Sequence, residues 1–228
     1  MMQLWIGNKN YSSWSMRPWV LMRHFGLPFD EVMVRFDDMQ AGSDFKRRIG
    51  AITPAARVPV LVDGGTTVWD SMAIAEYLAE THPALPLWPR DKPQRARARC
   101  LCAEMHAGFG ALRSAFPMNI ELGMPELGPR LLAEQPAAAA DWTRITGMWT
   151  DALATSGGPF LFGEFGIVDA YYAPVVMRAR SYALPLAGAA KAYADSVVAS
   201  PAVAAWIEQA LREKTFVEVD EPYRQSRS

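Results

Sequence analysis

The first eighty residues change repeatedly between the two spacings that distinguish strands from helices. In 30–36 every second residue is apolar, with Val32, Val34 and Phe36 on one face, as in a strand with one buried side. The glycine pair 64–65 separates two short β-branched runs, which indicates a hairpin. The full pattern predicts a strand at 3–7, a helix at 16–25, a strand at 30–36, a helix at 43–50, strands at 58–63 and 66–69, and a helix from Asp70 to the proline at 83.

The rest of the chain is alanine-rich and follows only the helical spacing. A proline-rich stretch begins at Pro83 and ends at Pro93, which indicates a connection between two units. We therefore predict an α/β domain over 1–83 with the order β-α-β-α-β-β-α, a linker over 84–92 and an all-α domain over 93–228. The predicted helices of the second domain are 93–116, 126–134, 137–155, 167–182, 188–198 and a last one capped by Ser200.

Composition and charge narrow the function classes. Half of the 228 residues are hydrophobic and 21% are charged, which is typical of a folded chain. The net charge of −1 gives no long-range attraction to nucleic acid or to an anionic membrane, so we expect neither as a partner. No apolar run approaches a membrane span and no basic leader is present, so we expect a cytoplasmic protein. Cys100 and Cys102 have no nearby ligand histidines, so we expect no metal.

The stretch NYSSWSMRPW, residues 10–19, raises a question about charge. Pro18 lacks an N–H and is best tolerated in the first turn of a helix, which predicts an N-cap near Ser15 and leaves Tyr11, Ser12, Ser13 and Trp14 in the preceding loop. Hydroxyl groups would then surround a helix N-terminus, which favours anions. Arg17 is electrostatically misplaced there unless a negative group is near. The alternative is simple capping, with Arg17 paired to an internal acid.

Two further motifs share this character. Val58 precedes a proline that opens a strand, and such an X–Pro bond can be cis. Asp70 and Ser71 place an acid and a hydroxyl at the start of a helix that follows a strand. Each motif alone is also explained by capping or by an edge strand.

Taken together, YSSWSMR, RVPVLVD and DSMAIAEYL, followed by a helical second half, resemble the soluble glutathione S-transferase family, and most closely its serine-type, zeta-like bacterial members. The resemblance spans essentially the whole chain. It implies a thioredoxin-like first domain with a cis-proline, a helical second domain, a homodimer, and glutathione as co-substrate. It places the activating hydroxyl on Ser12 or Ser13. It implies that glutathione also contacts Trp14, Arg57, Val58, Pro59, Asp70 and Ser71, with Lys46, Arg47 or Arg57 as the cation for the glycyl carboxylate.

Two departures from the family pattern limit what the resemblance implies. Trp14 stands where isomerases of maleylacetoacetate carry a cysteine, which puts isomerase activity in doubt. In the stretch GIVD, Gly166 stands where a serine or threonine normally caps a helix, with Asp169 three residues later. We expect Asp169 to support folding rather than catalysis.

The mechanism implied by the resemblance is activation of a thiol. A free thiol has a pKa of about 8.5, and a hydroxyl that donates to the thiolate lowers it. We predict transfer of glutathione to small hydrophobic electrophiles, in a pocket formed by Trp14, Phe109 and Arg113. His106 is interpreted as a packing or interdomain residue. The alternatives are a glutathione-dependent isomerase, peroxidase or dehalogenase, and a carrier that binds glutathione or other ligands without chemistry.

Overall fold

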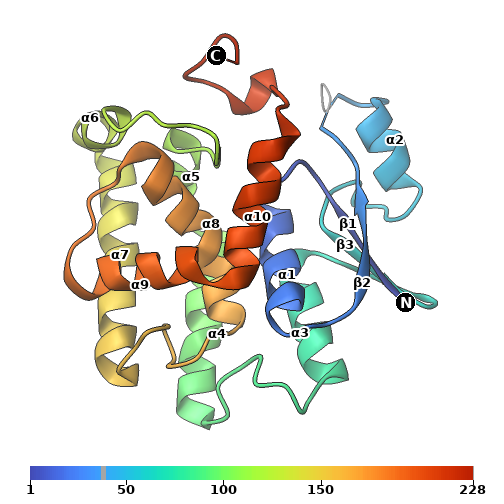
Figure 1. The fold of residues 1–228 in the computed structure, drawn as a ribbon, viewed down its shortest axis with the longest axis horizontal. Coiled ribbons are helices and arrows are strands. Elements are labelled where there is room, and N and C mark those ends of the chain that lie inside the picture. The colour runs from blue at the N-terminus through green and yellow to red at the C-terminus, as the bar shows by residue number, and fades with distance from the viewer. Residues whose placement is uncertain (37–39, 228) are drawn as a thin grey trace.

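The structure is a computed structural model that describes residues 1–36 and 40–227. Its first part alternates strands and helices, and its second part is helical (Figure 1). The elements of the first part are β1 (Met2–Ile6), α1 (Ser13–His24), β2 (Phe29–Met33), α2 (Asp44–Gly50), β3 (Val60–Asp63), β4 (Thr66–Trp69) and α3 (Ser71–Thr81). Those of the second part are α4 (Lys92–Ala107), α5 (Gly110–Ala115), α6 (Leu127–Glu134), α7 (Pro136–Ser156), α8 (Ile167–Tyr182), α9 (Gly188–Ala199), α10 (Pro201–Glu213) and a 3₁₀ turn, η1 (Glu218–Asp220).

The predicted order β-α-β-α-β-β-α is confirmed. Within the described residues four strands form one mixed sheet in the order β2-β1-β3-β4. β1 pairs in parallel with β2 and antiparallel with β3, and the 64–65 hairpin brings Val60 opposite Trp69. A mixed sheet of this order with α1 and α3 packed against it is the thioredoxin-like domain that the resemblance implied, and the helical domain follows it. The boundaries 1–83, 84–92 and 93–228 stay a prediction.

Two predicted boundaries were wrong. Helix α1 begins at Ser13 with Ser12 as N-cap, not near Ser15, so Pro18 lies inside the helix. The N-cap bond of Ser12 starts the helix one turn earlier than the proline alone suggested, and Pro18, which has no N–H, cannot make the bond to the Trp14 carbonyl at this point of the helix. The predicted helix 93–116 is two helices, because Phe109 adopts a left-handed backbone with φ 55°. At Gly108 a Cβ atom would lie 2.8 Å from the Glu104 carbonyl oxygen, so this break requires glycine.

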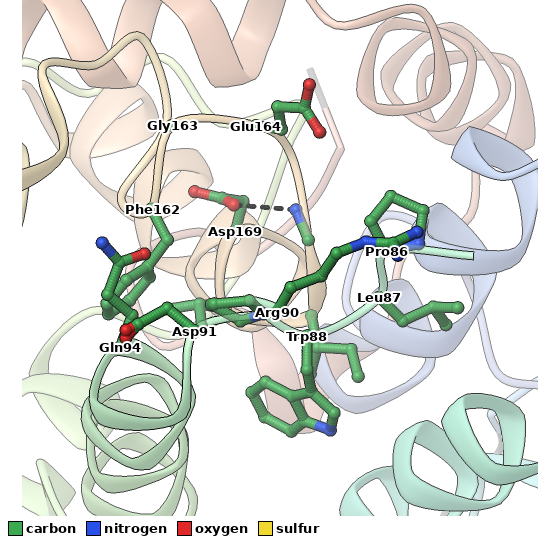
Figure 2. Close-up of a pocket in the computed structure, with 14 residues that line it drawn as sticks. Pro86, Leu87, Trp88, Arg90, Asp91, Gln94, Phe162, Gly163, Glu164 and Asp169 are labelled. Atoms are coloured by element: carbon green, nitrogen blue, oxygen red, sulfur yellow. Dashed lines mark hydrogen bonds between the residues drawn. The ribbon is translucent and has the colours of Figure 1, made fainter. Parts of the chain in front are cut away.

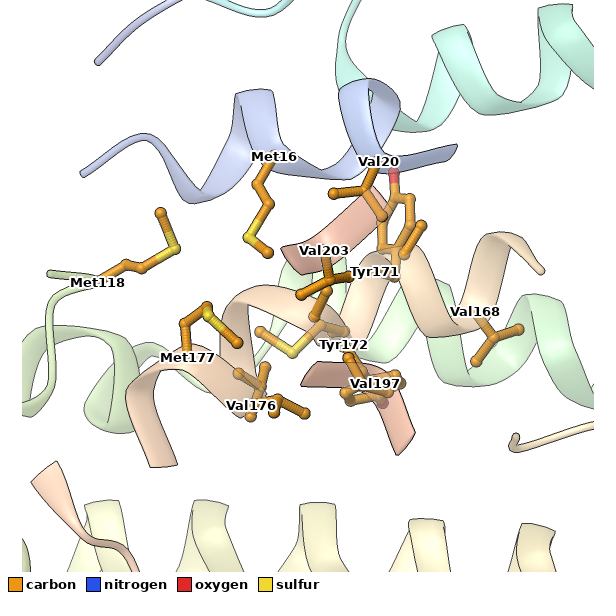
Figure 3. Packing of buried hydrophobic residues seen from close by; sticks show 14 of the residues in the cluster. Met16, Val20, Met118, Val168, Tyr171, Tyr172, Val176, Met177, Val197 and Val203 are labelled. Carbon is orange, nitrogen blue, oxygen red and sulfur yellow. The ribbon is translucent and has the colours of Figure 1, made fainter. Parts of the chain in front are cut away.

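One continuous core joins the two domains. Of the residues in α8 only Arg180 is exposed or half-exposed, so this helix runs through the middle of the protein. Met16 and Val20 project from α1 toward the side of α8 that carries Tyr171 and Met177 (Figure 3). α10 also packs on α1, where the rings of Trp19 and Trp206 lie 5.2 Å apart in an edge-to-face contact. A helix of the first domain is therefore held by two helices of the second.

The loop before α8 has the capping role predicted for Asp169. The Asp169 carboxylate accepts a hydrogen bond from the Gly166 N–H at 2.9 Å (Figure 2) and a second one from the Leu161 N–H at 3.1 Å. A Cβ atom at Gly166 would lie 3.0 Å from the Leu87 carbonyl oxygen, which explains why a glycine replaces the usual serine or threonine. The same loop and the stretch 86–94 enclose a cavity of about 300 Å³. We assign this region to folding.

Candidate functional site

A cleft with a volume of about 530 Å³ and several polar side chains in its walls lies between the two domains. Its walls come from the loop before α1, from α2, from the chain before β3, from α5, from α8 and from η1. The lining residues are Tyr11, Ser12, Ser13, Trp14, Phe36, Phe45, Lys46, Arg57, Val58, Arg113, Pro117, Met118, Arg178, Val219 and Asp220.

The N-terminus of α1 presents two hydroxyl groups to this cleft. Ser12 is buried, and its Oγ accepts the Ser15 N–H at 3.3 Å while its hydroxyl donates to Ser15 Oγ at 2.7 Å. Ser15 is fully buried and also accepts the Gly7 N–H at 3.1 Å. Ser13 is half-buried in the first turn. The hydroxyl of Ser12 is thus held in a fixed position, whereas that of Ser13 borders the cleft without such a framework.

The chain before β3 also lines the cleft. The Val58–Pro59 peptide bond is cis, and Val58 lines the cleft. Lys46 and Arg57 line it as well, and Lys46 Nζ donates to the Ala56 carbonyl at 3.1 Å. Arg47, the third cation predicted for the glycyl carboxylate, does not line the cleft. It is exposed and pairs with Asp44 at 3.2 Å.

The second helix end, at α3, adjoins the cleft but does not line it. Asp70 is the N-cap, and its carboxylate accepts the Met72 N–H at 2.8 Å. Ser71 is buried, with its hydroxyl 3.2 Å from the Tyr171 hydroxyl and 3.5 Å from Nη1 of Arg17. Arg17 therefore connects the two helix ends directly, since it belongs to α1 and donates to the first residue of α3.

His106 makes a contact between the two domains, as its interpretation as a packing or interdomain residue predicts. Its Nε2 lies 3.5 Å from the Asp70 carboxylate, and its ring meets the Trp14 ring edge-on at 5.3 Å. Trp14 in turn covers the Arg17 guanidinium, whose centre is 4.3 Å from the ring centroid. This chain of contacts ties the loop of α1 to the start of α3, so the two helix ends belong to one site.

The predicted electrophile pocket is only partly as expected. Trp14 and Arg113 line the cleft, whereas Phe109 is buried in the hydrophobic core and does not line it. Phe109 adopts a left-handed backbone and so does not continue the helix in which the sequence pattern placed it. Arg178 of α8 lines the cleft instead. Sequence reasoning missed Arg178 because it lies in a helix whose other residues are almost all buried and apolar.

The C-terminal segment, residues 214–227, was also missed. The Tyr11 hydroxyl donates to the Glu221 carboxylate at 2.6 Å. The same hydroxyl oxygen accepts a hydrogen bond from the Val217 N–H at 3.4 Å. Burial, together with the hydrogen bond to Glu221, raises the pKa of Tyr11 well above its usual value. Val219 and Asp220 are thereby held against the cleft. Nothing in the sequence connects residues separated by 210 positions.

Removing the Tyr11 hydroxyl should loosen this segment. In Tyr11→Phe the buried Glu221 carboxylate loses one donor, and we expect a loss of about 1 kcal/mol in the free energy of unfolding. The larger effect is local: amide hydrogen exchange at 215–223 should accelerate at least severalfold, while exchange in β1 and β3 stays unchanged. Equal protection of 215–223 in both proteins would contradict this role of Tyr11.

The described residues were also compared with the requirements of a metal site and of a membrane-spanning helix. Among the described residues no three or more histidine, cysteine, aspartate or glutamate side chains are grouped as metal ligands. No described helix has both the length and the apolar character needed to cross a bilayer.

Known proteins resemble this chain in both halves. Residues 11–81 match the glutathione S-transferase N-terminal domain, and residues 125–209 match the C-terminal domain of the same family. A probable maleylacetoacetate isomerase 2 of Drosophila melanogaster is 28% identical over 177 residues, which is 77% of this chain and 74% of that protein. A probable maleylacetoacetate isomerase of Caenorhabditis elegans is 42% identical over 69 residues, 30% of this chain and 32% of that protein.

The fold agrees with solved structures of the same kind. A glutathione transferase homologue from Burkholderia, solved with bound glutathione, superposes with a TM-score of 0.69 at 23% identity, over 92% of this chain and 98% of that one. A diazinon-metabolizing glutathione S-transferase of the silkworm Bombyx mori has the same TM-score at 20% identity, over 93% and 98% of the two chains. With matched domains in both halves and a shared fold along nearly its whole length, the chain belongs to the glutathione S-transferase family.

Proposed function

We propose that this protein is a glutathione transferase, in which Ser12 donates a hydrogen bond to the thiolate of bound glutathione and so prepares it for attack on an electrophile. The observation that carries the proposal is the hydroxyl of Ser12, held at the N-terminus of α1 in the lining of a cleft that Val58 of the cis Val58–Pro59 dipeptide also lines. Because the chain belongs to the glutathione S-transferase family, we take glutathione to be the ligand of this cleft.

The other polar groups suit the remaining parts of the tripeptide. The backbone at Val58 can pair with the cysteinyl residue, and Lys46 and Arg57 are the cations that border the cleft near the glycyl carboxylate. The γ-glutamyl ammonium suits Asp70. Because the Ser71 hydroxyl already contacts Tyr171 and Arg17, we assign the γ-glutamyl carboxylate to the N–H groups of the first turn of α3.

The free energies involved show that one serine hydroxyl and one helix N-terminus are enough to lower the thiol pKa, and the geometry favours Ser12 over Ser13 as that serine. Lowering a thiol pKa by about two units needs roughly 2.7 kcal/mol of preferential stabilisation of the anion. One hydroxyl donor contributes about 1.5–3 kcal/mol and a helix N-terminus about 0.3–1 kcal/mol. Ser15 holds the Ser12 oxygen in place, so only the Ser12 proton has to turn when the anion forms, whereas the Ser13 hydroxyl would first have to be ordered. In the structure the Ser12 hydroxyl donates to Ser15 Oγ at 2.7 Å, so the Ser12 proton has to turn toward the cleft when the thiolate binds, with Ser15 then donating to Ser12.

The direct test is ultraviolet titration of the thiol. The protein should be retained on immobilised glutathione, and the thiolate absorbance near 240 nm should appear at a pH about two units lower in the complex than in free glutathione. A bound thiol that titrates at its solution value would assign the protein as a carrier. Failure to bind glutathione at all would refute the proposed function.

A glutathione-dependent isomerase is a second candidate, favoured by the two relatives with that name. An isomerase uses the same activated thiolate, with addition followed by release of glutathione. Trp14 stands at the position of a cysteine in that class, which favours the transferase over the isomerase. Consumption of glutathione in proportion to product supports the transferase, and turnover without consumption supports the isomerase.

We also propose that the chain forms a homodimer. The family resemblance implies it, and Trp69 on the edge strand β4 is 42% exposed, which is unusual for a tryptophan without a partner surface. Light scattering should give about twice the chain mass of 25.2 kDa. A mass near 25 kDa would refute the dimer and leave the activity untouched.

A cytoplasmic location and a role in detoxification are likewise proposals from the family resemblance. Fractionation of the source cells tests the first. The second requires that a strain without the protein becomes more sensitive to an electrophile that the purified enzyme conjugates.

A further inference from the structure

Three arginine side chains, those of Arg17, Arg113 and Arg178, gather where the two domains meet. None forms an ion pair with a carboxylate within residues 1–36 and 40–227. They also repel one another: the charges of Arg17 and Arg113 add to burial in lowering the pKa of Arg178, to about 9. Buried charges are normally paired, so this group lacks an anion.

Arg178 has the clearest need for a ligand. It is 4% exposed, and Nε donates to the Phe116 carbonyl at 2.8 Å while Nη1 donates to the Pro174 carbonyl at 3.2 Å. These two bonds fix the plane of the guanidinium and use carbonyl groups, not charged ones. The residue lines the cleft, where Nη2 makes none of these bonds. A fixed guanidinium with one free edge suits an anionic oxygen.

Arg113 borders the same part of the cleft. Its Nη1 makes a long bond of 3.4 Å to the His106 carbonyl, and its guanidinium lies 5.6 Å from the Trp14 ring centroid. Burial lowers the pKa of Arg113, and Asp141 opposes this at a distance, but the Asp141 carboxylate is engaged by the Leu112 N–H at 3.0 Å.

Among the lining residues that the structure describes, Asp220 is the one with a negative side chain. Burial and the adjacent Glu221 raise its pKa to about 6, which reduces the charge that it sets against the arginines. Among the described lining residues, the two guanidinium groups of Arg113 and Arg178 thus outnumber the one carboxylate.

Glutathione does not satisfy these two arginines in the arrangement proposed above. Its glycyl carboxylate lies near Lys46 and Arg57, and its γ-glutamyl group lies at α3. Both positions are on the thioredoxin-like domain, whereas Arg113 belongs to α5 and Arg178 to α8. The two arginines are therefore left for the second substrate.

We propose that the second substrate is an organic anion: an electrophile that carries a carboxylate, which Arg178 and Arg113 bind beside the thiolate. This deepens the proposed function, on which it rests, and changes the class predicted from the sequence from a hydrophobic electrophile to an acidic one. The apolar walls formed by Trp14, Pro117 and Met118 hold its carbon skeleton. In a substitution, the glutathione sulfur forms a bond to the electrophilic carbon, the bond from that carbon to chlorine breaks, and chloride leaves with the electron pair.

The test compares two electrophiles that differ in one charge: 4-chloro-3-nitrobenzoate and its methyl ester. For each, kcat/KM with glutathione is divided by the uncatalysed rate constant at the same pH. We expect the acid to be preferred by about tenfold or more, the ratio expected of one charged hydrogen bond. In Arg113→Gln, which alters a half-exposed side chain, this preference should fall severalfold. Arg178→Met should abolish it, and Arg180→Gln, an exposed arginine on the same helix, should leave it unchanged.

A binding measurement supplements the rates. With glutathione saturating, 3-nitrobenzoate should bind more tightly than 3-nitrobenzamide to the wild type, and equally to Arg113→Gln, as read by tryptophan fluorescence. If glutathione binds with a lowered thiol pKa but the ester is turned over as well as the acid, the inference is wrong and the proposed function stands. If glutathione does not bind, both fail. Should Arg178→Met not fold, Arg113→Gln and Arg180→Gln still decide the result.

Discussion

Replacing Ser12 by alanine is expected to lower kcat/KM for glutathione conjugation by about 10- to 100-fold. It should also raise the pKa of the bound thiol by about one to two pH units. The change removes one hydrogen bond to an anion, worth about 1.5–3 kcal/mol, and leaves the cleft otherwise intact. The loss should therefore diminish at high pH, where glutathione is a thiolate without help. Rates from pH 6 to 9.5, together with thiol titration, measure both effects.

Two companion variants separate chemistry from folding. Ser12 also caps α1, so alanine there costs about 0.5–2 kcal/mol of stability, whereas glycine costs only a few tenths. Ser12→Gly should show the full kinetic loss with little change in unfolding. Ser13→Ala is the matched control on the adjacent hydroxyl, and its loss should be under about threefold. If Ser13→Ala shows the large loss and Ser12→Gly does not, the roles of the two serines are exchanged.

Asp169→Ala is expected to cause the largest loss of stability, about 2–4 kcal/mol. The buried carboxylate accepts the N–H groups of Gly166 and Leu161, and alanine leaves both donors without partners. The loop also packs against the stretch 86–94, so the start of α8 and the linker should loosen together. Chemical denaturation measures the loss. Asp195→Ala, which alters an exposed partner of Lys191, is the control and should change stability by less than about 0.5 kcal/mol.

The pH dependence of this effect has a definite sign. Burial raises the pKa of Asp169 to about 6, and the two N–H bonds oppose that rise. Because the folded pKa is above the unfolded value of about 3.9, the proton-linked part of this group's contribution to stability is complete below about pH 3.9 and is lost as the pH rises through about 6, whereas the bonds to the two N–H groups remain. The stability of the wild type relative to Asp169→Asn should therefore decrease between pH 4 and 7 and be constant above. An increase over that window would contradict the raised pKa.

The helices and strands could largely be predicted from the sequence, because each is decided by neighbours a few residues apart. The hairpin at 64–65, the order of the first domain and the capping role of Asp169 all rest on such local patterns. The same reasoning failed at Phe109, where tertiary packing turns the backbone into a left-handed conformation that no local spacing signals. It failed at Ser12 too, because a serine cap overrode the position that Pro18 suggested.

By itself, then, the sequence determined the elements, their order and the polar residues that border the candidate glutathione site, since short motifs carry these. Only the tertiary structure decided which charges face one another. It placed Arg178, from a helix that is otherwise almost wholly buried, beside Arg113, and it brought residues 214–227 to Tyr11. Electrostatic energy depends on distance through space, and contacts between residues separated by a hundred or more positions leave no periodicity in a single chain.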